Sequence, residues 1–207
     1  LSFAQNVIED ELNSTSDNPI IKPEEHNVFH GGNFHGDYIS LEMDKVKIVI
    51  TKLTMLMERQ LNYLLSDHLN QKFPPFLNAS TLGLNFGYQG LQFTATSTTA
   101  ENQTLSNPMS IHSIPNNHDN QDIVSMGTNS ALMTKKVIEN SFQVISIHIM
   151  AICQAIDLLT SEEKEKLSSK TLKLYNLVRT KVDFLTSDRV MSDEISSVFK
   201  LLKETQL

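Results

Sequence analysis

The residues best suited to chemistry lie in a run of amides and acids over residues 114–127. The run reads Ile-Pro-Asn-Asn-His-Asp-Asn-Gln-Asp-Ile-Val-Ser-Met-Gly and directly precedes a long apolar segment. Amide side chains donate and accept hydrogen bonds and stay neutral when they lose water, as a buried pocket for a polar small molecule requires. The candidate binding residues are Asn117, Asn120 and Gln121. The same composition also fits a capping and turn segment, in which one of the acids caps the next helix.

A second candidate is the glycine-rich turn Gly-Gly-Asn-Phe-His-Gly over residues 31–36. Glycine permits positive φ angles and a close approach of the backbone to another group. One interpretation is a simple turn before a helix that starts at Asp37, and the other is a turn that brings Phe34 against a ligand. His35 is a poor metal candidate because no second ligand stands at a suitable spacing.

The helical period of the apolar residues predicts the elements that position these two segments. Its strongest patterns give helices over about residues 38–66 and 123–160, far longer than the mean of about 11–12 residues. A loop over residues 20–36 carries the glycine-rich turn. The prediction is an all-α fold, because Gly and Pro are too few for a turn-rich β architecture. The remaining predicted helices cover residues 2–14, 87–106, 169–185 and 192–203.

The two longest predicted helices carry apolar residues on more than one side. A compact chain of 207 residues has no obvious way to bury both of them. Apolar faces that are left over meet other chains, so we expect a helical core that is shared between subunits. We also expect two domains, a long-helix bundle with the site loops over residues 1–160 and peripheral helices over residues 161–207.

Composition narrows the class of protein. The net charge of −7 is mixed along the chain, which argues against a nucleic-acid binder with a basic stripe. The single Cys153 excludes an intrachain disulfide framework and a thiolate metal cluster, so we expect a reducing, cytoplasmic location. The histidines are scattered, and we expect no metal. The chain has no uncharged apolar run long enough for a membrane span, and we expect no membrane partner.

Three blocks of the sequence resemble the aromatic amino acid ammonia-lyases, the family of histidine, phenylalanine and tyrosine ammonia-lyases. They are Ser-Asp-Asn-Pro at residues 16–19, Asn-Phe-His-Gly at residues 33–36 and Asn-Gln-Asp-Ile-Val-Ser-Met-Gly at residues 120–127. The resemblance runs from residue 1 to about residue 160. It implies a fumarase-like bundle of long helices, a homotetramer with each active site built from several subunits, and elimination of ammonia from an aromatic amino acid.

The resemblance also implies roles for single residues. Phe34 matches a residue beside the prosthetic group, and Gln121 falls where the histidine enzymes carry a carboxylate. A carboxylate suits an imidazole, whereas a neutral amide suits an uncharged phenyl or phenol ring. Asn117 matches a polar amide near the ring hydroxyl of tyrosine-type enzymes. We therefore expect tyrosine (giving coumarate) or phenylalanine (giving cinnamate) as substrate, with tyrosine favoured. The alternatives are a histidine ammonia-lyase giving urocanate, an aminomutase, and a non-catalytic helical assembly module.

The family's catalytic groups are missing from this chain. Its prosthetic group, 4-methylidene-imidazole-5-one, forms from an Ala-Ser-Gly triad, and the nearest string here is Asn-Ala-Ser-Thr at residues 78–81. The basic Tyr and the carboxylate-binding Arg of the family have no counterpart either. The resemblance thus implies a C-terminal portion with no catalytic residue of its own, which needs the N-terminal portion of the same enzyme. Glu101 is expected to be buried and paired, and to fix the loop that carries Asn107 and Pro108.

Overall fold

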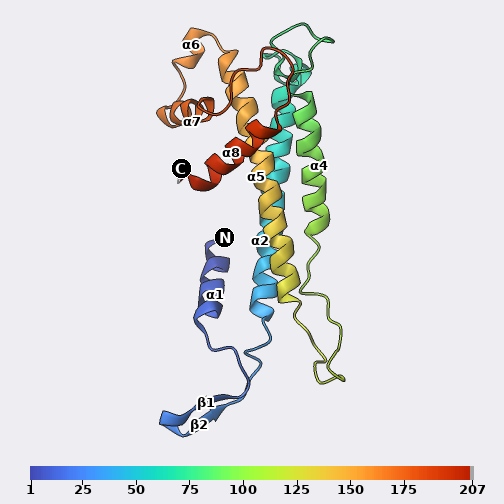
Figure 1. The fold of residues 1–207 in the computed structure, drawn as a ribbon, viewed down its shortest axis with the longest axis vertical. Coiled ribbons are helices and arrows are strands. Elements are labelled where there is room, and N and C mark those ends of the chain that lie inside the picture. Colours follow the sequence, from blue (N-terminus) through green and yellow to red (C-terminus); the bar gives the residue numbers. More distant parts are fainter. Residues whose placement is uncertain (206–207) are drawn as a thin grey trace. The chain divides into compact units, whose positions relative to one another are not determined.

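The protein is mostly helical, and the computed structural model describes residues 1–205 (Figure 1). The predicted all-α fold class is confirmed. The α-helices are α1 Ser2–Asn13, α2 Asp37–Leu65, α3 Asp67–Asn70, α4 Gln89–Leu105, α5 Gly127–Asp157, α6 Ser161–Lys164, α7 Ser169–Arg179 and α8 Ser192–Glu204. Two 3-10 turns, η1 Pro23–Glu25 and η2 Pro75–Leu77, interrupt the connections. Helices α1, α2, α4 and α8 match the predicted bounds within two residues.

The predicted loop over residues 20–36 contains a small β-hairpin. Strand β1 Ile20–Lys22 pairs antiparallel with β2 Asn27–Phe29, so that Ile20 lies opposite Phe29. The prediction of an unstructured loop was wrong here, because a strand of three residues is too short to show an alternating pattern. The side chain of Asn18 accepts a hydrogen bond from the backbone N–H of Gly31 over 3.2 Å, and this bond closes the base of the hairpin.

Helix α5 starts four residues after its predicted start at residue 123 and ends three residues before its predicted end at residue 160. The reason for the late start is local. Asp122 accepts the N–H of Ile123 over 2.9 Å, and the Ser113 hydroxyl accepts the N–H of Val124 over 2.9 Å. These side chains compete with the helix for the backbone donors. Met126 then adopts a left-handed φ of 54°, which separates the amide run from the helix.

Helix α7 ends at Arg179, six residues before the predicted end at residue 185. The backbone of Leu185 is instead held by the buried side chain of Gln154 on α5. Gln154 donates to the Leu185 carbonyl and accepts the Leu185 N–H, each over 3.0 Å. A distant partner therefore replaces the helical hydrogen bonds that the local pattern predicted.

The chain forms two compact units, and helices α2, α4 and α5 each contribute residues to both. The first unit comprises Leu1–Thr51 and Gln103–Ile138. The second comprises Lys52–Asn102 and the chain from Glu139 onward.

The second unit holds the apolar core. Its centre is fully buried and includes Leu61 from α2, Ile147 from α5, and Tyr88, which stands directly before α4. Burial of each such large side chain stabilises the fold by about 1.5–3 kcal/mol. Helix α8 crosses α5 (Figure 1), where the rings of Phe199 and Phe142 meet edge to face with centroids 5.8 Å apart.

The first unit is organised around a buried carboxylate, Asp44 on α2. Asp44 accepts hydrogen bonds from the backbone N–H groups of Met109 (3.0 Å) and Ser110 (2.8 Å) and from the Ser130 hydroxyl (2.7 Å). The fully buried ammonium of Lys47 lies 2.7 Å away. Burial alone raises the pKa of Asp44, but these donors outweigh it and hold that pKa well below its usual range.

Asp44 is thus the residue that fixes the segment after α4, a role the sequence assigned to Glu101. Glu101 was expected to be buried, but it is exposed in this chain. It accepts a hydrogen bond of 2.8 Å from the side-chain amide of Asn140. The prediction failed because Asp44 lies far from this loop in sequence, more than 60 residues before Met109 and Ser110.

Candidate functional site

The glycine-rich turn is a compact bend directly before α2. The backbone N–H of His35 donates to the Gly32 carbonyl over 2.9 Å, which closes the turn. Gly36 has a φ of 78°, a value that side-chain-bearing residues rarely adopt. Its carbonyl then accepts the N–H of Ser40 over 3.1 Å in the first turn of α2. Phe34, at the centre of the turn, is 45% exposed.

The amide run forms a tight loop of its own. The backbones of Asn116 and Gln121 exchange two hydrogen bonds, of 3.0 Å and 3.2 Å. Between them Asn117, His118 and Asp119 have φ angles of 54°, 54° and 63°. Asn, Asp and His tolerate this left-handed region better than most residues, so the polar composition of the loop has a conformational cause as well.

The structure joins this amide loop to the glycine-rich turn. The Nε2 atom of His35 lies 2.7 Å from the carbonyl oxygen of Ile123. The Ser125 hydroxyl donates back to the carbonyl of His35 over 2.6 Å. A Cβ on Gly127 would lie 3.1 Å from the carbonyl oxygen of Gly36, so the two backbones approach closely there. Two segments that lie about 90 residues apart in sequence therefore form one junction.

The four predicted binding residues flank this junction. Asn117 and Asn120 are exposed at the tip of the amide loop, and Gln121 is half-buried at its base. Phe34 stands next to His35 in the turn, with the two rings 6.3 Å apart. The junction that joins their segments is made by His35 and Ser125 rather than by the four side chains themselves. The roles of these four residues stay predictions.

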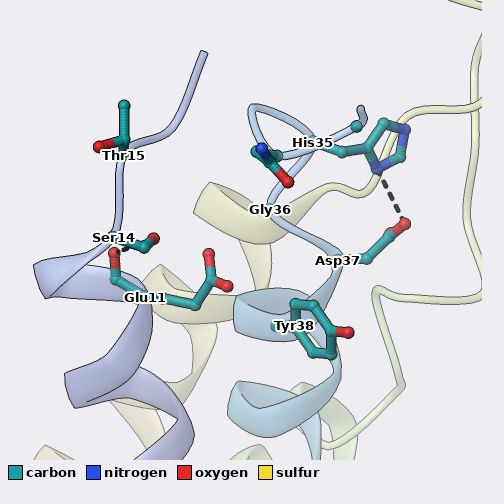
Figure 2. Close-up of a pocket in the computed structure, with 9 residues that line it drawn as sticks. Glu11, Ser14, Thr15, His35, Gly36, Asp37 and Tyr38 are labelled. Carbon is teal, nitrogen blue, oxygen red and sulfur yellow. Dashed lines mark hydrogen bonds and ion pairs between the residues drawn. The ribbon is translucent and has the colours of Figure 1, made fainter. Parts of the chain in front are cut away.

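A cavity of about 520 Å³ lies beside the turn (Figure 2). Its lining carries two carboxylates, an imidazole, a phenol, two hydroxyls and an amide, but no Lys or Arg. The residues come from the end of α1, the turn and the start of α2: Glu11, Ser14, Thr15, Gly32, Asn33, His35, Gly36, Asp37 and Tyr38. His35 Nδ1 lies 2.9 Å from an Asp37 carboxylate oxygen, as the dashed line in Figure 2 shows.

Sequence reasoning missed His35 and Ser125 as the residues that make the junction. The available signal was their type, because both stand in the blocks that resemble the family and both carry hydrogen-bonding side chains. It also missed Asp44, which is placed three residues before Lys47 on a buried face. An acid and a base at this spacing lie on one side of a helix and can pair.

Burial shifts the pKa of two further groups in the described part of the chain. Burial raises the pKa of the Cys153 thiol to about 11, so this thiol stays protonated and unreactive. Burial also lowers the pKa of His148. Within residues 1–205, no group of three or more His, Cys, Asp or Glu side chains is arranged to hold a metal ion. No helix among these residues is both long and apolar enough to cross a membrane.

Two long helices thus begin at a glycine-rich turn and at an amide loop, and side-chain hydrogen bonds join these two segments. A model of the aromatic amino acid lyase family matches residues 1–180. The chain belongs to this family. The match extends past residue 160, near which the resemblance in sequence was expected to weaken.

Individual relatives agree with this assignment. Tyrosine ammonia-lyase from Cupriavidus metallidurans is 41% identical over 207 residues, which cover all of this chain and 38% of that protein. Histidine ammonia-lyase from Natranaerobius thermophilus is 37% identical over 201 residues, or 97% of this chain and 39% of that protein. The crystal structure of tyrosine aminomutase from Streptomyces globisporus has a TM-score of 0.90 at 41% identity, over 96% of this chain and 37% of that one. The chain thus spans about two fifths of the length of these relatives.

Proposed function

We propose that this chain forms part of an aromatic amino acid ammonia-lyase that eliminates ammonia from tyrosine, or from phenylalanine, to give coumarate or cinnamate. The observation that carries the proposal is the hydrogen-bonded junction between the Phe34 turn and the Asn120–Gln121 loop. It gives an aromatic wall and a set of neutral amides a common anchor at the start of two long helices. A planar, largely apolar ring with one polar end needs these two kinds of group.

The amide at Gln121 supports an uncharged ring over an imidazole. Gln121 is the half-buried residue of the loop, whereas Asp119 and Asp122 are exposed. The carboxylate of Asp122 is already bonded to the Ile123 N–H. A half-buried neutral amide can accept from a phenol, or lie beside a phenyl ring, without the cost of an unpaired charge. We propose Asn117 and Asn120 as its companions toward the far end of the ring.

Phe34 is the residue of this chain that would face the prosthetic group of the family. Its ring is 45% exposed on a turn that is held at both ends, so it offers an apolar face to an uncharged, conjugated ring supplied from outside this chain. The 4-methylidene-imidazole-5-one group, when bound, supplies the electrophile that makes the amine a better leaving group. The part of this chain is to bind and orient the substrate ring and to keep water from it.

We propose that the complete enzyme is a homotetramer, in which this chain is joined to the N-terminal portion of the same enzyme. Many large apolar side chains on the long helices are exposed in the isolated chain, which supports burial against other chains. They include Val49, Leu53 and Leu56 on α2, Phe93 on α4 and Leu132 on α5. In that assembly residues 1–160 would form the long-helix bundle and residues 161–207 the peripheral helices.

The test is a spectroscopic assay on the full-length enzyme that contains this chain. Tyrosine, phenylalanine and histidine are supplied separately, and coumarate, cinnamate and urocanate are followed. We expect coumarate or cinnamate to form with the higher kcat/KM. Urocanate as the main product would identify a histidine ammonia-lyase instead, and no turnover of any of the three would favour a non-catalytic assembly module.

An aminomutase is the second candidate, and it is supported by the likeness to the Streptomyces globisporus enzyme. Elimination and 2,3-migration of the amine begin with the same substrate. They differ in whether ammonia leaves the site or returns to the ring-bearing carbon. Chromatography for β-tyrosine in the same assay distinguishes them, since a lyase accumulates coumarate and free ammonium without the β-amino acid.

A further inference from the structure

We propose that His35 is a positioning residue, whose imidazole Nε2–H holds the amide loop in register with the Phe34 turn. This inference rests on the proposed function, because the loop and the turn are there taken to bind the substrate ring. His35 itself does not touch the substrate in this account. It acts through Ile123, two residues after Gln121.

The two ring nitrogens of His35 do different things. Nε2 lies 2.7 Å from the Ile123 carbonyl, within the range of a short hydrogen bond. Nδ1 lies 2.9 Å from Asp37, but among the described residues it has no well-aligned hydrogen-bond partner. The directional bond that ties the ring to the loop is therefore the one from Nε2. The His35 side chain is only 21% exposed, so water competes weakly for that bond.

The bond acts on the loop as a whole. The paired backbones of Asn116 and Gln121 close residues 116–121 into one loop. The Ile123 side chain is 60% exposed, so its backbone carbonyl, and not apolar packing, is what anchors this end of the loop. Loss of the Nε2 bond would free the loop on the side that carries Gln121.

A second contact in the junction allows this effect to be isolated. Ser125 donates to the main-chain carbonyl of His35, and that bond does not depend on the residue type at position 35. The glycine-rich turn also keeps its own backbone bonds. A substitution at His35 should therefore remove the bond to the Ile123 carbonyl, while the bond between Ser125 and the His35 carbonyl still joins the starts of α2 and α5.

The charged and titratable groups around the ring are acidic or neutral. Asp37 and Tyr38 approach from the start of α2, and Glu11 from the end of α1, in the shared cavity of Figure 2. Asp122 stands next to Ile123 on the loop side. Among residues 1–205, no Lys or Arg lines this cavity. Since the Ile123 carbonyl can only accept, Nε2 is the donor in this contact.

The experiment compares two amides that mimic one ring nitrogen each. His35→Gln places an N–H close to the position of Nε2, and His35→Asn places one close to Nδ1. In the full-length enzyme we expect His35→Gln to keep kcat within about 3-fold of wild type, and His35→Asn to lower kcat by about 10- to 100-fold. KM should change less than kcat, because orientation and not uniform binding is lost. His68→Asn, at a side chain that is 92% exposed, is the matched control.

Amide hydrogen exchange gives a readout that does not depend on activity. We expect residues 116–124 to exchange faster in His35→Asn than in wild type, and His35→Gln to keep the wild-type protection. Equal behaviour of the two variants, in rate or in exchange, would overturn the inference. If His35→Asn does not fold, fast exchange of the loop in His35→Gln would overturn it and wild-type protection would support it. An inactive wild type would count against the proposed function alone, since the exchange comparison still decides this inference.

Discussion

The hydroxyl of Ser125 donates a hydrogen bond of 2.6 Å to the main-chain carbonyl of His35. Ser125 stands two residues before α5, and His35 stands two residues before α2. This one bond therefore fastens the starts of the two longest helices of the chain. It also brings together the two segments that carry the candidate site.

Ser125→Ala should weaken that fastening. The serine is buried, and its loss leaves the His35 carbonyl without this donor, so we expect the free energy of unfolding to fall by about 1–3 kcal/mol. A thermal melt of the full-length protein checks this, with kcat measured in parallel. Ser196→Ala is the control, since that exposed serine donates to the Ser192 carbonyl within α8. Equal melting temperatures for Ser125→Ala and the control would contradict the prediction.

Asp44→Asn should be more damaging than any substitution in the junction. The carboxylate holds the backbone of Met109 and Ser110 and pairs with the fully buried ammonium of Lys47. Removal of one partner leaves a buried charge without its counterion, which costs about 3–5 kcal/mol. Unfolding by denaturant measures the loss. The double variant Asp44→Asn, Lys47→Met should recover part of it, and no recovery would argue that the Lys47 pair is not the cause.

Asp44 also predicts how stability depends on pH. Its donors hold the folded-state pKa well below the ordinary value of 3.8, against the raising effect of burial. The charged form is thus favoured by folding, and its stabilisation is complete well above pH 3.8. It is lost as the pH falls below 3.8 toward the lower folded pKa. Melting temperature should drop over this acid range in wild type and drop less steeply in Asp44→Asn. Parallel curves would rule out this carboxylate as the source.

An element of the fold can be predicted from the sequence when the residues that determine it are local. Helices α2 and α8 follow from a period of apolar residues that each segment carries by itself. The end of α7 does not follow, because Gln154 on α5 holds the backbone of Leu185 from a distance. The three-residue strands of the hairpin are too short to carry a pattern at all.

The same limit applies to the site. The glycine-rich turn and the amide loop could each be recognised from residue types and from likeness to a family. Their junction could not, because His35 and Ile123 lie 88 residues apart and meet through a backbone carbonyl. Backbone acceptors have no signature in a sequence. For the same reason Asp44, bonded to two backbone N–H groups, was overlooked in favour of Glu101.

Phe34→Ala should lower turnover and leave the assembly intact. The ring is 45% exposed on a turn that is held by backbone bonds, so its loss removes an apolar wall without opening a core. We expect kcat of the full-length enzyme to fall by about 10-fold or more, while size-exclusion chromatography shows the wild-type subunit number. A variant with the wild-type rate would remove Phe34 from the site.

The substrate preference of Gln121→Glu shows whether a neutral amide at this position recognises an uncharged ring. The measurement is the ratio of kcat/KM for tyrosine to kcat/KM for histidine, in the full-length wild type and in the variant. We expect the ratio to fall by about 10-fold or more in Gln121→Glu, since a carboxylate disfavours the phenol ring and can pair with an imidazole. An unchanged ratio would contradict this expectation.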